Sequence, residues 1–137
     1  MKSFNIGIIG FGTVGGGVYK VLQSFPNINI KKIAVKNLNK KRNIENFDTS
    51  LLTDNPYEIV NNPEIDIIVE VCGGVDPAFD ILKTALNNKK HIVTANKELL
   101  AKRGSELFKI AKDNNVIILY EAAVAGGIPI IMPIKTI

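Results

Sequence analysis

Residues 4–15 read FNIGIIGFGTVG, and this stretch decides the fold. The apolar run at 4–9 predicts a buried strand, and Gly10, Gly12 and Gly15 follow it with the spacing Gly-x-Gly-x-x-Gly. In a strand-to-helix turn, these glycines allow a tight turn, approach of the backbone to a pyrophosphate, and close helix packing. The helix N-terminus adds free N–H groups and positive partial charge. We therefore predict a dinucleotide site, with a ligand-free glycine turn as the alternative.

The rest of the chain alternates short strand-like runs with longer helical stretches. Besides 4–9, we predict strands at 28–35, 65–71, 91–94 and 116–120. Such alternation is typical of an α/β protein with crossover helices on a parallel sheet. The fold class predicted is a Rossmann-like, doubly wound parallel sheet.

Apolar spacing and capping residues place the helices. We predict one helix from Val14 to Phe25, ended by Pro26, and a short one that begins at Pro56. Another has Asp76 as N-cap, Pro77 in its first turn and its end at Asn87-Asn88, and a further one covers about 105–113. Residues 36–54 are expected to be a mostly irregular connection.

The C-terminal segment has an apolar pattern without an obvious partner. We assign residues 1–125 to a dinucleotide-binding domain and read residues 126–137, GGIPIIMPIKTI, as the start of a connection to further chain. The chain therefore reads as truncated at its C-terminus.

Composition excludes several classes of protein. An apolar content of 46% with 22% charged residues is that of a globular chain and not of a disordered one. A single cysteine and a single histidine exclude a disulfide scaffold and a zinc module of the usual spacing. No apolar run is long enough for a membrane helix, and no signal-peptide cleavage region precedes the first strand. We expect a cytoplasmic protein without a membrane partner.

The net charge of +4 comes from one segment. Residues 31–42 hold six basic residues and no acid, while the rest of the chain is mildly acidic. Aromatic residues do not interleave with this segment, and no nucleic-acid recognition motif is present, so we expect no nucleic-acid partner.

The same segment bears on cofactor choice. About 20 residues after the glycine turn, NAD-specific proteins often carry an acid that binds the ribose hydroxyls. This chain has Lys36 near that position, followed by Lys40, Lys41 and Arg42. A base pairs with the 2′-phosphate of NADP, so we expect NADP, with NAD possible. A solvated lysine-rich loop is the alternative.

The other strand ends carry polar or glycine residues as well. Cys72-Gly73-Gly74 follows the third predicted strand, Ala95-Asn96-Lys97 follows the fourth, which ends at Thr94, and Glu121 follows the fifth. Carboxyl ends of parallel strands share one edge of the sheet, so Gly73, Thr94 and Lys97 are expected in one site. Cys72 is expected to be structural rather than a nucleophile, because the single histidine, His91, begins a strand at the opposite edge. The role of Glu70, inside an apolar strand, stays open.

Together GFGTVGGGV, VEVCGG, HIVTANKELLA and YEAAVAGGIPI, in this order, closely resemble homoserine dehydrogenases over essentially the whole chain. The resemblance implies an oxidoreductase that interconverts L-homoserine and L-aspartate 4-semialdehyde with NAD or NADP, in threonine, methionine and isoleucine biosynthesis. It also implies a homodimeric full-length protein. An aspartate dehydrogenase-like enzyme and a stand-alone nucleotide-binding module are the alternatives.

The resemblance also assigns residues. It places Phe11, Thr13 and Val14 at the cofactor phosphates, Thr94 by the nicotinamide half, and Lys97 as the active-site lysine. With the residues above, the cofactor-binding set is Gly10, Phe11, Gly12, Thr13, Val14, Gly15, Lys36, Cys72, Gly73, Thr94 and Lys97.

By resemblance alone, a monovalent cation such as sodium is held by Glu121, Val124, Gly126 and Ile128. The resemblance also implies that residues 1–125 are the NAD(P)-binding domain and that residues 126–137 lead into the family's catalytic and dimerisation domain, which is absent from this chain. Because hydride transfer needs substrate and nicotinamide held together, we expect this chain to bind cofactor without turnover.

Overall fold

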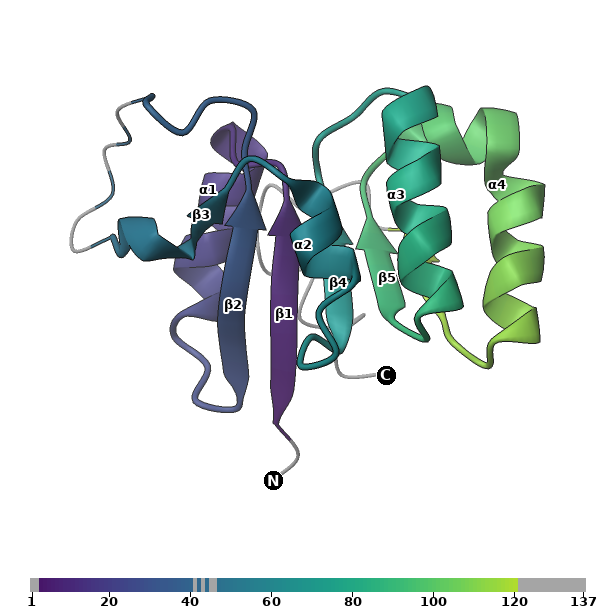
Figure 1. The fold of residues 1–137 in the computed structure, drawn as a ribbon, viewed down its shortest axis with the longest axis horizontal. Coiled ribbons are helices and arrows are strands. Elements are labelled where there is room, and N and C mark those ends of the chain that lie inside the picture. Colours follow the sequence, from purple (N-terminus) through teal and green to yellow (C-terminus); the bar gives the residue numbers. More distant parts are fainter. Residues whose placement is uncertain (1–2, 41, 43, 45–46, 121–137) are drawn as a thin grey trace.

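The computed structural model describes residues 3–40, 42, 44 and 47–120. Its strands form one parallel sheet, in the order β3-β2-β1-β4-β5-β6. The chain builds outward from β1 to β3, then crosses to the other side of β1 and continues to β6 (Figure 1). This order confirms the doubly wound, Rossmann-like α/β fold. The strands are β1 (Phe4–Ile9), β2 (Ile28–Ala34), β3 (Leu52–Thr53), β4 (Ile67–Glu70), β5 (His91–Thr94) and β6 (Ile118–Tyr120).

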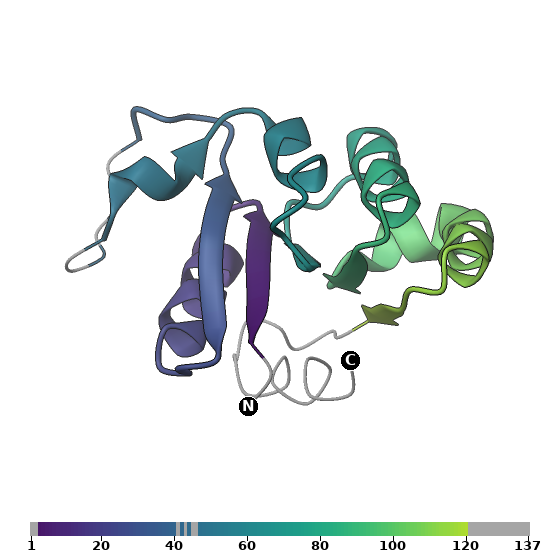
Figure 2. The same cartoon turned by 60° about the horizontal axis from the view of Figure 1, so that its bottom comes forward.

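Helices cover both faces of this sheet (Figure 2). Helix α1 packs on one face, where Val18, Tyr19 and Leu22 join the first apolar cluster. Helices α2, α3 and α4 contribute to a second cluster on the opposite face. The helices are α1 (Thr13–Leu22), α2 (Pro56–Val60), α3 (Asp76–Asn87) and α4 (Lys97–Asp113), with a 3-10 turn, η1, at Thr49–Leu51.

Strand β4 lies at the centre of the sheet and is buried on both faces. Ile67 and Val69 point into the cluster under α1, and Ile68 points into the cluster under α2 to α4. All three are fully buried, and each such side chain stabilises the fold by about 1.5 to 3 kcal/mol relative to exposure. A central parallel strand therefore reads as a continuous apolar run, as the sequence does here.

Some predicted boundaries are wrong. Helix α4 begins at Lys97 and not near 105, because the Asn96 side chain caps it by accepting a hydrogen bond from the Leu99 N–H at 3.1 Å. The N-cap of α3 is Val75, without a side-chain cap, so Asp76 is the first helical residue rather than the cap. The 36–54 connection contains η1 and β3 in addition to irregular chain.

The remaining predicted elements are found. Helix α2 begins at Pro56, with Asn55 as a side-chain N-cap, and α3 ends at Asn87. The proposed boundary at 125 and the segment 126–137 lie outside the described residues. In the part of the chain that is described, no helix is long and apolar enough to cross a bilayer.

Candidate dinucleotide-binding site

The glycine turn between β1 and α1 requires glycine at two positions for different reasons. Gly10 has a φ of +101°, and a Cβ there would lie 2.9 Å from the backbone of Cys72. A Cβ on Gly15 would lie 2.4 Å from the carbonyl oxygen of Gly10, so α1 packs directly against the turn. A Cβ on Gly12 would meet nothing within 4 Å, so the backbone there faces open space. Such a turn suits a pyrophosphate laid against the start of a helix.

A cavity of about 690 Å³ opens beside this turn. It lies where the carboxyl ends of β1, β2 and β4 meet, on either side of the point at which the strand order reverses. Ligands bind at this place in doubly wound sheets. The cavity is lined by Ile9, Gly10, Phe11, Gly12, Ala34, Val35, Lys36, Asn37, Lys40, Arg42, Asp54, Pro56, Val71, Cys72, Gly73, Gly74, Pro77 and Ile81.

The end of the cavity next to β2 is basic. Lys36, Lys40 and Arg42 line it together with one acid, Asp54. The guanidinium of Arg42 donates to the backbone carbonyls of Lys40 and Asn37, at 2.9 and 2.8 Å. These bonds fold the loop after β2 back on itself and keep its cations at the cavity.

Phe11 anchors this basic loop to the glycine turn. Its ring stacks on Phe47 with 5.2 Å between ring centroids and meets Tyr19 of α1 edge-on at 5.9 Å. The Arg42 guanidinium lies 5.9 Å from the Phe11 ring centroid, within the range of a cation–π contact. The residue that resemblance assigns to the phosphates therefore also joins two walls of the cavity.

Glu70, whose role the sequence left open, lies at the end of β4 and is fully buried. Its carboxylate accepts hydrogen bonds from the backbone N–H groups of Cys72 and Gly73, at 3.0 and 3.1 Å, and from the Thr94 hydroxyl at 2.6 Å. The Cys72 thiol donates to the same carboxylate at 3.2 Å. An ionised carboxylate can accept all of these donors, because it offers only acceptor sites.

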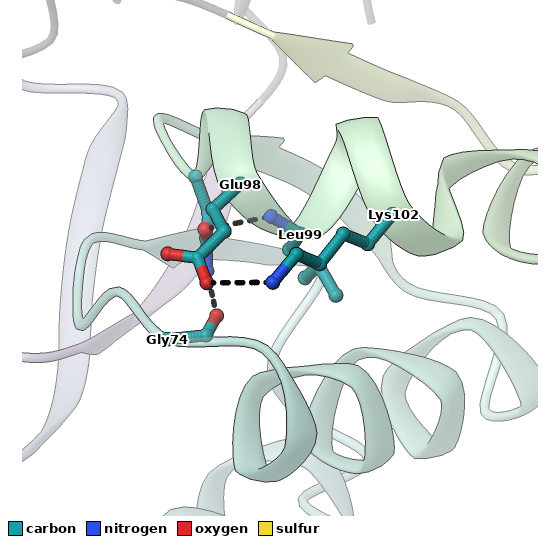
Figure 3. Close-up of polar contacts among 5 residues, drawn as sticks. Gly74, Glu98, Leu99 and Lys102 are labelled. Atoms are coloured by element: carbon teal, nitrogen blue, oxygen red, sulfur yellow. Dashed lines mark hydrogen bonds and ion pairs between the residues drawn. The ribbon is translucent and has the colours of Figure 1, made fainter.

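Asn96 links the turn after β4 to the start of α4. Its side-chain amide donates to the carbonyl of Gly74 at 2.7 Å, while its side-chain oxygen caps the helix at Leu99. The turn that carries Gly74 is thus tied to the first turn of α4, where Leu99 donates to the same Asn96 side chain (Figure 3). The backbone N–H of Asn96 donates to the Thr94 hydroxyl oxygen at 3.0 Å.

Cys72 and His91 do not form a pair of nucleophile and base. Burial and then the neighbouring Glu70 carboxylate raise the pKa of the Cys72 thiol to about 12. Cys72 is therefore a thiol and a hydrogen-bond donor at neutral pH. The Nδ1 atom of His91 accepts a hydrogen bond from the Ile117 N–H at 3.1 Å, at the opposite edge of the sheet from the cavity.

The cavity brings together part of the predicted set: Gly10, Phe11, Gly12, Lys36, Cys72 and Gly73. Gly15 is buried beneath the turn, and Thr94 is fully buried with its hydroxyl bonded to Glu70. Lys97 is exposed at the start of α4, outside the lining. Thr13 and Val14 open α1, but their side chains are outside the described part of the structure.

Asn37, Asp54 and Asn96 are not among the site residues predicted from the sequence. The sequence signal for Asn96 is its residue type, since asparagine is a preferred N-cap, but residues 97–104 hold too few apolar positions to mark the helix that it caps. The predicted cation ligands Glu121, Val124, Gly126 and Ile128 lie outside the described residues. Over residues 3–120, apart from the gaps named above, no group of three or more His, Cys, Asp or Glu residues is placed to hold a metal ion.

Known proteins resemble this chain in sequence and structure. The family model described as homoserine dehydrogenase, NAD binding domain, matches residues 10–121. Homoserine dehydrogenase of Bacillus subtilis is 42% identical over 98% of this chain and 33% of its own length, and that of Synechocystis is 42% identical over 95% and 31%. The chain therefore spans about a third of the length of these relatives.

Solved structures of homoserine dehydrogenases also resemble this chain. A homoserine dehydrogenase from Thiobacillus denitrificans superposes with a TM-score of 0.81 and 44% identity, over 98% of this chain and 33% of the other. The Staphylococcus aureus enzyme gives a TM-score of 0.79 and 44% identity, over 89% and 33%. The chain belongs to the homoserine dehydrogenase family and corresponds to its NAD-binding domain.

Proposed function

We propose that the cavity binds NADP in preference to NAD, with Lys36 at the 2′-phosphate. The cations Lys36, Lys40 and Arg42 gather at the end of β2, where the adenosine ribose of a bound dinucleotide lies in this fold. A phosphate oxygen paired with such a side chain forms a charge-assisted hydrogen bond. The gathering of these cations at one end of the cavity is the observation that carries the proposal.

The proposed activity of the longer protein is interconversion of L-homoserine and L-aspartate 4-semialdehyde. The bound nicotinamide supplies or accepts the hydride. This chain holds the cofactor by its glycine turn, and Lys97 contacts the substrate from the start of α4. Support comes from the position of Lys97, directly after Asn96, whose side chain bonds to Gly74 at the cavity.

Further parts of the proposal rest on the family resemblance. They are a monovalent cation at Glu121, Val124, Gly126 and Ile128, a homodimeric full-length protein, and a cytoplasmic location. We also propose that this chain alone binds cofactor without turnover, because it spans about a third of its relatives. The family match favours this activity over an aspartate dehydrogenase-like one.

Fluorescence titration with NADPH and NADH tests the cofactor assignment. The unaltered chain should bind NADPH more tightly, and Lys36→Ala should weaken NADPH binding about tenfold while leaving NADH binding unchanged. Lys109→Ala, an exposed lysine of α4, removes the same charge far along the chain and serves as the control. Equal effects of Lys36→Ala on both cofactors would show that Lys36 does not contact the 2′-phosphate.

Homoserine oxidation by the longer protein tests the activity. Lys97→Met there should abolish turnover, while NADPH still binds, more weakly if Lys97 also contacts it, because the residues that line the cavity are unchanged. Turnover unaffected by this change would remove Lys97 from the reaction.

A further inference from the structure

A closed ring of hydrogen bonds joins the turn after β4 to the start of α4. Glu70 binds the Thr94 hydroxyl and the Gly73 N–H; the Thr94 oxygen accepts from the Asn96 N–H; and the Asn96 side chain returns to Gly74. The turn 73–74 closes the ring through the backbone. Glu70, Thr94 and Asn96 are all at most 6% exposed, so the bonds that join these three residues are shielded from water, whereas Gly73 and Gly74 lie at the surface.

The ring sets the position of the 73–74 turn relative to the start of α4. Gly73 and Gly74 have φ angles of 76° and 80°, and a Cβ on either would meet nothing within 4 Å. A side chain at either position would point into open space, and the hydrogen bonds of the ring tie this turn to its neighbours. The start of α4 is fixed by the same Asn96 side chain that binds Gly74.

The ring is placed where it can act on the cofactor without touching it. Gly73 and Gly74 line the cavity, whereas Glu70, Thr94 and Asn96 do not. Lys97 follows Asn96 directly, so the angle of the helix start also sets the position of Lys97. The basic end of the cavity, at Lys36 and Arg42, belongs to the loop after β2 and shares none of these hydrogen bonds.

We propose that Asn96 is a positioning residue, which together with Glu70 and Thr94 holds the 73–74 turn against α4 and so shapes the nicotinamide end of the site. This inference rests on the proposed cofactor site. It predicts that breaking the ring affects the nicotinamide half of the ligand and spares the adenosine half.

Asn96→Asp breaks one bond of the ring and keeps the helix cap. The aspartate oxygen still accepts from the Leu99 N–H, and a negative charge at a helix N-terminus is favourable. The amide donor to Gly74 is lost, and a carboxylate oxygen faces the carbonyl instead. Asn87→Asp makes the same charge change at the far end of α3, where Asn87 only accepts a hydrogen bond from Asn114 in the bonds described, and is the matched control.

The ligands are NADPH and adenosine 2′,5′-bisphosphate, which lacks the nicotinamide half. Their dissociation constants are measured by titration on the unaltered chain and both variants. Asn96→Asp should weaken NADPH binding about tenfold and change bisphosphate binding less than twofold, while the control changes neither. Asn96→Ser, which keeps a capping oxygen and also lacks the amide, should show the same split.

Two other outcomes of these titrations would contradict the positioning role of Asn96. If the unaltered chain binds NADPH and both Asn96 variants bind it equally well, or lose both ligands to the same degree, Asn96 is not a positioning residue for the nicotinamide end, although the cofactor site stands. If the unaltered chain binds neither ligand, the proposed cofactor site is wrong and the positioning role falls with it.

Discussion

The Glu70 carboxylate and the Thr94 hydroxyl face each other across the paired strands β4 and β5, 2.6 Å apart and both fully buried. Backbone N–H groups of Cys72 and Gly73 also bind the carboxylate. In a low-dielectric interior these bonds are strong, and losing one partner leaves the other unsatisfied. A buried polar contact thus joins the carboxyl ends of β4 and β5, beside the turn that lines the cavity.

Replacing Thr94 tests how much its hydrogen bond to Glu70 contributes to the free energy of unfolding. Thr94→Val keeps the shape but removes the hydroxyl, which leaves a Glu70 oxygen and the Asn96 N–H without their partner. We expect the free energy of unfolding to fall by about 1 to 3 kcal/mol. Thr94→Ser keeps the hydroxyl and loses one buried methyl group, at a cost of about 0.8 kcal/mol. Urea unfolding measures both, and a valine variant as stable as the unaltered chain would contradict the role given to the hydroxyl.

Alanine substitutions at two neighbouring glycines of α1, Gly15 and Gly16, should change the free energy of unfolding in opposite directions. In Gly15→Ala the new Cβ would lie 2.4 Å from the Gly10 carbonyl oxygen, so the turn or the helix must shift. We expect a loss of about 1 to 3 kcal/mol in unfolding free energy, together with weaker cofactor binding. Gly16→Ala is the control, since its Cβ would meet nothing within 4 Å. It should stabilise the chain by about 0.5 to 1 kcal/mol, because alanine favours helix. Thermal unfolding distinguishes the two, and equal effects would contradict the close packing at Gly15.

The Cys72 thiol should react slowly with a disulfide reagent at pH 8. Burial, and then the Glu70 carboxylate, raise its pKa from 9.0 to about 12, so the thiolate fraction in the folded chain is very small. We expect a rate at least about a hundredfold below that of the chain unfolded in guanidinium chloride. A folded chain that reacts as fast as the unfolded one would refute this environment.

Because the pKa of Cys72 is raised, the free energy of unfolding should decrease as the pH becomes alkaline. Folding favours the neutral thiol, so its contribution is fully present below pH 9.0 and is lost as the pH rises toward 12. In Cys72→Ser, whose hydroxyl does not titrate in this window, that part of the decline should be absent. Unfolding free energies compared between pH 8 and 11 measure the difference.

Much of the fold could be predicted from sequence because it depends on local signals. The apolar run at 4–9 and the glycine spacing after it predict β1, its turn and α1, and the buried run of β4 is a continuous apolar segment. Strand β3 was missed because two residues, Leu52 and Thr53, are too few to show a period of two. The start of α4 was missed because residues 97–104 have few apolar positions, and a side-chain cap at Asn96 starts the helix.

The site was harder to predict, because its geometry depends on contacts between distant segments. Lys36 and Gly73, which were predicted from their positions shortly after strands, both line the cavity beyond the carboxyl ends of β2 and β4. Glu70 and Asn96 act through partners on other strands and turns, at separations of 24 and 22 residues. A single sequence does not reveal such pairs: the place of Glu70 in an apolar strand indicates that it needs a partner but not which one, and Asn96 alone is compatible with a surface position.

Backbone amide NMR signals of the 137-residue chain, followed during titration with NADPH, test the cofactor cavity most directly. The signals of Phe11, Gly12, Lys36 and Gly73, which line the cavity, should shift together and saturate. Those of Asn5 and His91, at the opposite edge of the sheet, should stay in place. Shifts centred on that opposite edge, or none at millimolar NADPH, would contradict a dinucleotide site in this cavity.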